Sequence, residues 1–157
     1  RNFDKSKLIF ESLKNEDFNV IPIKNIEEKI SEVDIISCAT LSKTPLVLGK
    51  YLKNGQHVDL VGAYKKDMRE ADNETISKAS VYIDTYQGGL KESGDIVIPL
   101  QNGTLKKEDI KADLFQLCSN LKKGRENNEE ITVFKSVGHA LEDLAAANYY
   151  YNKFTNE

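Results

Sequence analysis

Four short runs of strand-forming residues, separated by stretches with helical patterns, constrain the fold of this chain most. The runs cover residues 34–40, 57–62, 81–84 and 131–134. The first is continuously apolar, which is typical of parallel strands buried on both faces. Strands that alternate with helices at such spacings predict an α/β domain with a largely parallel sheet.

Weaker patterns give the remaining elements. We expect a strand at residues 19–23, an extended piece at residues 95–100 and helices in several intervals. The helical intervals are a first helix capped by Asp4, residues 25–33, residues 72–79, residues 107–121 and a long last helix that begins after Gly138. Gly124 is expected to end the fourth of these.

Composition excludes several classes of protein. Hydrophobic residues make up 39% and charged residues 30% of the chain, which indicates a globular domain. The net charge is −3, and no basic stripe interleaved with aromatic residues is present, so nucleic acid is not an expected partner. No apolar run approaches the ~20 residues that span a membrane. Cys38 and Cys118 have no metal-ligand spacing, and we expect reduced thiols in a cytoplasmic protein.

The ends of the strands are the places to look for a site, because ligands of parallel α/β sheets bind at the carboxyl edge. These ends are residues 39–41, 61–64, 84–86 and 135–138. At the last of them a strand runs directly into a helix. Free backbone N–H groups and the positive end of a helix dipole would meet there, which suits an anion. Ser136 could equally be a plain N-cap of the last helix.

The start of the chain lacks the elements with which a dinucleotide-binding domain opens. No strand followed by G-x-G-x-x-G precedes the first helix, and the chain begins at Arg1 rather than at a methionine. Either the fold is a different one, or its first strands and glycine loop lie upstream. We expect the second, that is, the back portion of a longer protein.

Three segments then carry a resemblance to a known family. They contain V-G-x-x-x-x-D-M-R-E from Val61, D-T-Y-Q-G-G-L from Asp84 and V-F-K-S-V-G-x-A-x-E-D from Val133. In order and spacing they resemble the ornithine cyclodeaminase/mu-crystallin family. The resemblance implies a partial, Rossmann-type doubly wound NAD(P) domain over residues 1–135. It also implies that residues 136–157 return toward a substrate and dimerisation domain, and that the whole protein is a homodimer.

The resemblance also implies which positions contact the cofactor. The positions are Ala39 and Thr40 on the adenosine and ribose side, Val61 and Gly62 beside the nicotinamide, and Lys135, Ser136 and Val137 where the last strand ends. Arg1 would follow the second Rossmann strand, where an arginine favours the extra phosphate of NADP. Its alternative is a terminal arginine without a role.

One departure from the family bears on the reaction. Cyclodeaminases carry an aspartate two residues after V-G, and this chain has Tyr64 there. A phenol, with a pKa of about 10, is a poor base but can donate a proton. Asp67 is a second candidate, whose alternative is a surface charge. Arg69 and Glu70 are expected to form a structural ion pair, with contact to substrate or cofactor as the alternative.

The pattern therefore favours an enzyme that reduces imines of 2-oxo acids with NAD(P)H, of the ketimine or pyrroline-2-carboxylate reductase type. Its substrates would be small amino or imino acids. A true ornithine cyclodeaminase and a non-catalytic binding protein like mu-crystallin remain the alternatives. Without the glycine loop and the basic residues that hold substrate, we expect these 157 residues alone to be inactive.

Overall fold

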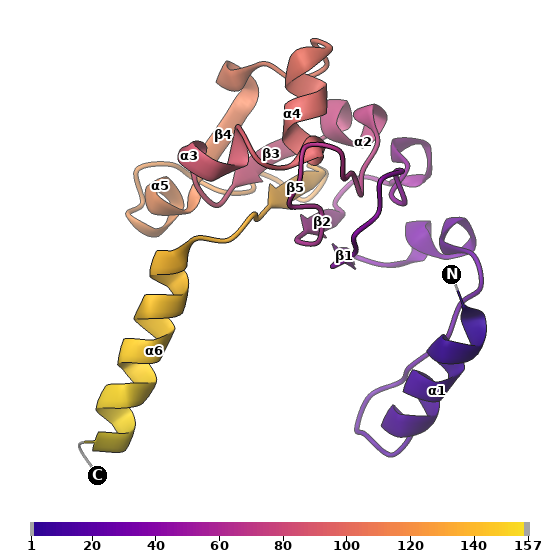
Figure 1. The fold of residues 1–157 in the computed structure, drawn as a ribbon. Helices are drawn as coiled ribbons and strands as arrows, with labels where there is room; N and C mark the ends of the chain where they lie inside the picture. Colours follow the sequence, from indigo (N-terminus) through magenta and orange to yellow (C-terminus); the bar gives the residue numbers. More distant parts are fainter. Residues whose placement is uncertain (1, 156–157) are drawn as a thin grey trace. The chain divides into compact units, whose positions relative to one another are not determined.

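The computed structural model describes residues 2–155, which form two compact units. The first unit ends at Val33 and the second begins at Asp34. Figure 1 shows both units coloured along the chain. Arg1, which was predicted to contact a cofactor, lies outside the described residues.

The first unit contains one α-helix, α1 (Phe3–Leu13), and two 3-10 turns, η1 (Ile26–Glu28) and η2 (Ile30–Glu32). Asn2, and not Asp4, caps α1, because its side chain accepts the backbone N–H of Asp4 at 2.9 Å. The predicted strand at residues 19–23 is wrong, since no strand is assigned to the described part of this unit. The predicted helix at residues 25–33 is also wrong. Asn25 makes no side-chain cap there, and only the two short turns form.

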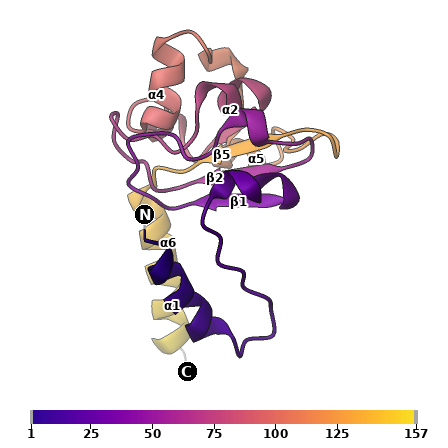
Figure 2. The ribbon, with the colours of Figure 1, turned by 90° about the vertical axis from the view of Figure 1, so that its right-hand side faces the viewer.

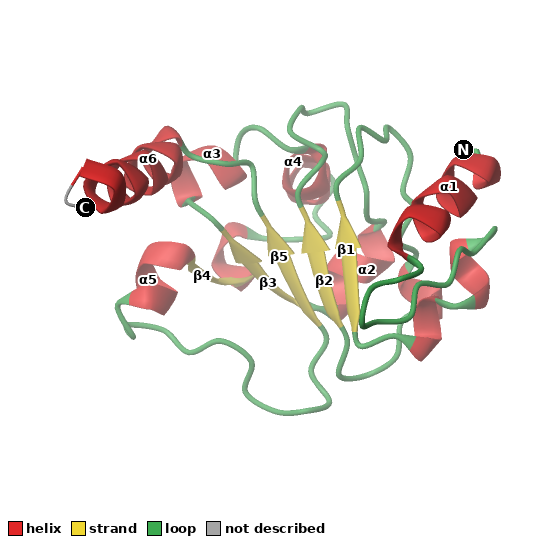
Figure 3. Ribbon diagram, turned by 90° about the horizontal axis from the view of Figure 1, so that it is seen from below, coloured by secondary structure: helices red, strands yellow, loops and turns green. Residues whose placement is uncertain are grey.

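The second unit is built on a parallel sheet, which confirms the predicted α/β class. Its strands are β1 (Ile35–Cys38), β2 (His57–Leu60), β3 (Ser80–Ile83), β4 (Ile110–Asp113) and β5 (Thr132–Lys135). All pairs are parallel, and the spatial order is β1-β2-β5-β3-β4, as Figure 3 shows. The last strand therefore inserts between β2 and β3, which brings its carboxyl end to the middle of the sheet.

Helices α2 (Asn73–Lys78) and α4 (Gly94–Gln101) lie on one face of this sheet (Figures 1 and 2). Apolar side chains of the strands are buried in the core, among them Val58, Leu60 and Val133. The remaining helices of the unit follow the strand ends and loops. They are η3 (Gly49–Tyr51), α3 (Tyr86–Gly89), η4 (Lys107–Asp109), α5 (Leu114–Cys118) and the long α6 (Ala140–Thr155).

Two intervals of the second unit differ from the sequence prediction. Residues 95–100, expected to be extended, form α4, because Ser93 accepts the N–H of Asp95 and starts a helix in an apolar run. Residues 107–121, expected to be one helix, divide into η4, β4 and α5. The division follows from side-chain alternation, since Ile110 and Ala112 are buried while Lys111 is exposed. The side chain of Asp113 then caps α5 by accepting the N–H of Gln116.

No helix within residues 2–155 has both the length and the apolar character needed to cross a lipid bilayer.

Candidate functional site

The strand ends predicted to form a site do meet at one edge of the sheet. Cys38, Leu60, Lys135 and Ile83 are aligned across the neighbouring strands β1, β2, β5 and β3. The segments that follow them carry every described candidate for cofactor contact: Ala39, Thr40, Val61, Gly62, Ser136 and Val137, together with Lys135 itself. The parallel register brings these segments to the same edge, because each strand stops at the same level.

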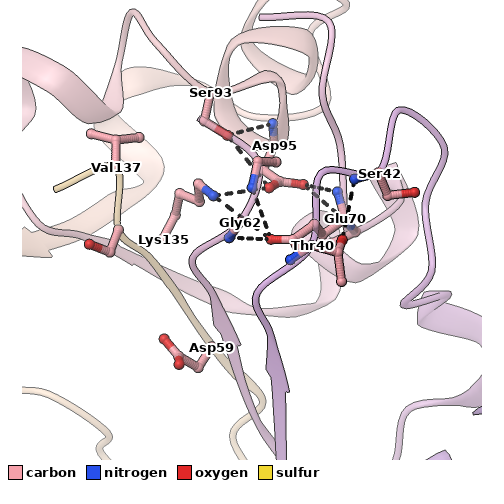
Figure 4. A network of polar contacts seen from close by, with 12 residues as sticks. Thr40, Ser42, Asp59, Gly62, Glu70, Ser93, Asp95, Lys135 and Val137 are labelled. Carbon is pink, nitrogen blue, oxygen red and sulfur yellow. Dashed lines mark hydrogen bonds and ion pairs between the residues drawn. The ribbon is translucent and has the colours of Figure 1, made fainter. Parts of the chain in front are cut away.

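One buried carboxylate, that of Glu70, holds the loops that follow β1 and β2 (Figure 4). Its Oε1 accepts the backbone N–H of Thr40 at 2.6 Å and the Thr40 hydroxyl at 2.7 Å. Its Oε2 accepts the N–H groups of Gly62 at 2.9 Å and Ala63 at 3.2 Å. The predicted ion pair between Glu70 and its neighbour Arg69 does not form. The Arg69 guanidinium donates to the carbonyl of Ala71 and to the Asn73 side chain instead.

A second carboxylate and a lysine complete this buried cluster. Asp95, in the first turn of α4, accepts the N–H groups of Glu70 at 2.7 Å and Ala71 at 3.0 Å. The Lys135 Nζ lies 3.3 Å from Asp95 Oδ2 and 4.0 Å from Glu70 Oε2, and all three side chains are fully buried. Burial raises the pKa of Asp95, while the N–H of Ala71 and the charge of Lys135 act in the opposite direction. The Lys135 side chain is therefore enclosed inside the protein in ion pairs, although its Nζ makes no hydrogen bond to any described residue, so only its backbone is left for a ligand.

A third carboxylate occupies the junction between β5 and α6. Oδ2 of the buried Asp84 accepts the N–H groups of Val137 at 2.7 Å and Gly138 at 2.8 Å, and the Ser136 hydroxyl at 3.3 Å. The expectation of free N–H groups at this junction is therefore wrong, because the protein's own carboxylate takes them. The interpretation of Ser136 as an N-cap is also wrong, since α6 begins four residues later, at Ala140.

The predicted catalytic candidates lie on the loop that follows β2. Tyr64 is 47% exposed, and the ammonium group of Lys65 lies 5.5 Å from the centre of its ring. Asp67 is exposed and pairs with Lys43 at 2.7 Å. The hydrogen bond from Lys43 lowers the pKa of Asp67 below its usual value. The loop thus presents a phenol and a carboxylate to solvent.

Sequence reasoning missed the three carboxylates that organise the site: Glu70, Asp84 and Asp95. Asp84 was noted only as a strand end, and Asp95 was placed in an extended segment. The signal that could have found Asp95 is the sequence Ser93-Gly94-Asp95 before an apolar run, which is typical of a helix start. Glu70 was singled out only as the end of the D-M-R-E motif, and its true partners Thr40 and Gly62 could not be predicted because they are 30 and 8 residues away.

Comparison with known proteins identifies relatives of this chain. The profile of the ornithine cyclodeaminase/mu-crystallin family matches residues 3–157. A Delta(1)-pyrroline-2-carboxylate reductase of Bacillus cereus is 43% identical over 80% of this chain and 39% of its own length. The chain therefore spans about two fifths of that relative.

Solved structures give the same relationship. The Thermococcus litoralis Delta(1)-pyrroline-2-carboxylate reductase, in complex with NADH and L-proline, superposes with a TM-score of 0.93. It is 37% identical, and the match covers 99% of this chain and 48% of that one. An archaeal alanine dehydrogenase dimer with bound NAD has a TM-score of 0.85 and 27% identity over 96% of this chain and 47% of its own. With the family profile matched along nearly its whole length, this chain belongs to the ornithine cyclodeaminase/mu-crystallin family.

Proposed function

We propose that this chain is the cofactor-binding part of an NAD(P)H-dependent reductase that acts on imines of 2-oxo acids, of the pyrroline-2-carboxylate reductase type. One observation carries the proposal. The segments 39–40, 61–62 and 135–137 converge at the carboxyl edge of β1, β2 and β5. They do so in a fold that superposes on a relative whose structure contains NADH and L-proline.

The chemistry of this edge fits the rings of a dinucleotide better than its phosphates. The N–H groups of Thr40, Gly62, Val137 and Gly138 all bind buried carboxylates, so they cannot also bind a phosphate. Apolar surface remains accessible beside them, since the Val61 side chain is 45% exposed. A flat nicotinamide or adenine ring can pack on such a surface. The pyrophosphate would have to be held by another part of the protein, such as a glycine loop.

Within this proposal, each residue predicted to contact the cofactor keeps the role expected from the sequence. Ala39 and Thr40 would line the adenosine and ribose side, and Val61 and Gly62 the nicotinamide side. At the end of β5, the backbone of Lys135 and the residues Ser136 and Val137 would approach the nicotinamide. Lys135 would contribute through its backbone, because its side chain is buried in an ion pair with Asp95.

Bound NAD(P)H would supply a hydride to the carbon of the C=N bond. The chain would then contribute a proton for the nitrogen and an orientation for the substrate. Tyr64 can donate a proton through its phenol, either directly or through water. Asp67 is the second candidate for proton transfer, but its ion pair with Lys43 lowers its pKa and so makes it a weaker base.

Several finer features of the whole protein are also proposals. We infer a preference for NADP, which rests on Arg1, and a cytoplasmic homodimer that engages neither nucleic acid nor a membrane. The net charge of −3 supports the lack of a nucleic-acid partner. A return of α6 to a substrate and dimerisation domain is supported by its exposed large side chains. These are Leu141, Leu144, Tyr149, Tyr150, Tyr151 and Phe154.

Absorbance of the reduced cofactor tests the proposal in the full-length protein. We expect oxidation of NADPH, and more slowly of NADH, when pyrroline-2-carboxylate is added. Tyr64→Phe should lower kcat by about 100-fold or more, in the range of a lost general acid. Release of ammonia from ornithine with oxidised cofactor, without imine reduction, would contradict the reductase and favour a cyclodeaminase.

A further inference from the structure

Three charged side chains from distant parts of the sequence meet in the interior just behind the proposed cofactor edge. Glu70 belongs to the loop between β2 and α2, Asp95 to the first turn of α4, and Lys135 to the end of β5. All three side chains are fully buried, and Figure 4 shows that they point toward one another. Burying charges costs free energy even when they are paired, so a cluster of this kind calls for an explanation beyond stability.

Glu70 is the member that reaches the loops of the site. It accepts four hydrogen bonds, two from Thr40 in the loop after β1 and two from Gly62 and Ala63 in the loop after β2. Hydrogen bonds to an ionised acceptor are stronger than those between neutral groups. Neither loop can shift relative to the other without breaking bonds to the same carboxylate.

The two loops also touch directly, so their relative position is set tightly. A Cβ atom at Gly62 would lie 1.9 Å from the backbone N of Thr40 and 2.1 Å from its carbonyl oxygen. Contact between backbones at this distance is open only to glycine. Glu70 therefore binds the two loops at the very point where they are packed most closely.

Asp95 holds Glu70 in turn through a hydrogen bond, and Lys135 is the ion-pair partner of both carboxylates without hydrogen-bonding to either. Asp95 accepts the backbone N–H of Glu70 at 2.7 Å, and Lys135 lies between the two carboxylates. Beyond Lys135 the chain continues directly into Ser136 and Val137. Through this cluster, all three segments that are proposed to contact the cofactor are connected.

We propose that Glu70 is a positioning residue, which holds the loops of Thr40 and Gly62 in the geometry that receives the dinucleotide, with Asp95 and Lys135 as its supports. This role rests on the proposed function, because it assumes that a dinucleotide binds at this edge.

Glu70→Gln tests the role in the full-length protein, with Glu74→Gln as the matched control. Glutamine keeps the shape of the side chain but replaces one acceptor oxygen by an NH₂ group, which cannot accept from the loops. Glu74 is an exposed carboxylate on α2 that pairs with Lys78. Lys135→Met is a poorer test, since two buried carboxylates without a cation would unfold the protein and hide any effect on the loops.

Glu70→Gln should change two measured quantities, the rate of amide hydrogen exchange in the loops and KM for the cofactor. In Glu70→Gln, amide hydrogen exchange at Thr40, Gly62 or Ala63 should become about 10-fold faster or more, while that of Val81 and Ile83 in β3 stays unchanged. KM for NAD(P)H should rise about 10-fold, as expected for the loss of one charged hydrogen bond, while kcat at saturating cofactor falls by less than about 3-fold. Glu74→Gln should change neither.

The other outcomes separate the two proposals. Equal acceleration of exchange in β3 and in the loops would make Glu70 a general stabiliser of the fold and overturn the positioning role. An unchanged KM in Glu70→Gln, with a wild type that binds NAD(P)H, would overturn the positioning role and leave the proposed function intact. A wild type that binds neither NADH nor NADPH would overturn both.

Discussion

The carboxylate of Asp84, at the end of β3, accepts the backbone N–H of Val137 at 2.7 Å, although the two residues are 53 positions apart in the sequence. The same oxygen accepts the N–H of Gly138, where the backbone turns with a φ of 83°. The exit from β5 is therefore shaped by a side chain from the neighbouring strand. The sequence suggests that this junction could bind an anion, but in the structure the carboxylate of Asp84 already occupies it.

Replacing Asp84 should destabilise the fold measurably. In Asp84→Asn one acceptor oxygen becomes a donor, and at least one N–H group loses its partner on the buried Asp84 side chain. We expect the free energy of unfolding to fall by about 1–3 kcal/mol, the range for a buried hydrogen-bonding group left unsatisfied. Urea unfolding of the variant measures this directly. Asp17→Asn, at an exposed position, is the control and should leave the midpoint unchanged. An unchanged midpoint in Asp84→Asn would mean that the junction holds without its carboxylate.

Most strands of the sheet could be predicted because their runs of β-branched residues are local signals. β1, β2, β3 and β5 all lie where the sequence placed them. β4 was missed because its short alternation at Ile110, Lys111 and Ala112 sits between residues that also fit a helix. α4 was missed because an apolar run with Ile96, Val97 and Ile98 has no periodicity that separates strand from helix.

The position of the site could be predicted from the sequence, but the contacts that hold it together could not. That the segments after β1, β2 and β5 would meet followed from the rule for parallel sheets. What holds them could not be predicted, because the bonds of Glu70 to Thr40 and of Asp84 to Val137 join residues 30 and 53 positions apart. The side chain of Lys135 illustrates the limit. Its place at the strand end was correct, but only the three-dimensional contacts show that it points into the protein.

Gly62 should tolerate no side chain. In Gly62→Ala the new Cβ would collide with the backbone of Thr40, which cannot move without breaking its bond to Glu70. We expect a loss of about 3 kcal/mol or more in the free energy of unfolding, at the upper end for overpacking. Gly124→Ala is the matched control, because a Cβ atom added at Gly124 would have no neighbour within 4 Å. Thermal unfolding of both variants should show a large shift for the first and almost none for the second. Equal shifts would contradict the close contact between the loops.

The two cysteines should differ in reactivity. Cys118 is exposed at the end of α5, whereas Cys38 is buried at the end of β1. A disulfide reagent such as Ellman's should therefore modify one thiol of this chain rapidly in the folded state and the second only after unfolding. Cys118→Ser should abolish the rapid phase, and Cys38→Ser should leave it in place. Rapid modification of both thiols in the native protein would show that the end of β1 opens readily.

Protonation of His57 should lower the stability of the fold. Burial lowers its pKa, with a smaller opposing effect from Asp59 and a further lowering from Arg125. Its Nδ1 lies 2.8 Å from the Thr132 hydroxyl. An unfolded chain would titrate this histidine at about 6.5.

Between the lowered pKa of His57 in the folded state and its ordinary pKa in the unfolded chain, the unfolded state binds more protons than the folded state. Stability therefore rises with pH in this range. The contribution of neutral His57 is fully present above about pH 6.5 and is lost as the pH falls through the lower, folded pKa. Urea unfolding of the wild type should therefore gain stability from about pH 5 to 7, relative to His57→Gln, which has no such titration.

The titration itself can be followed by NMR, because the chain contains only two histidines. In His139→Gln the remaining imidazole signal belongs to His57 and should titrate below about 6.5. A midpoint at or above this value would contradict the lowering by burial. It would also reverse the sign of the expected stability difference, since a folded state that binds the proton more tightly is stabilised by acid rather than weakened by it.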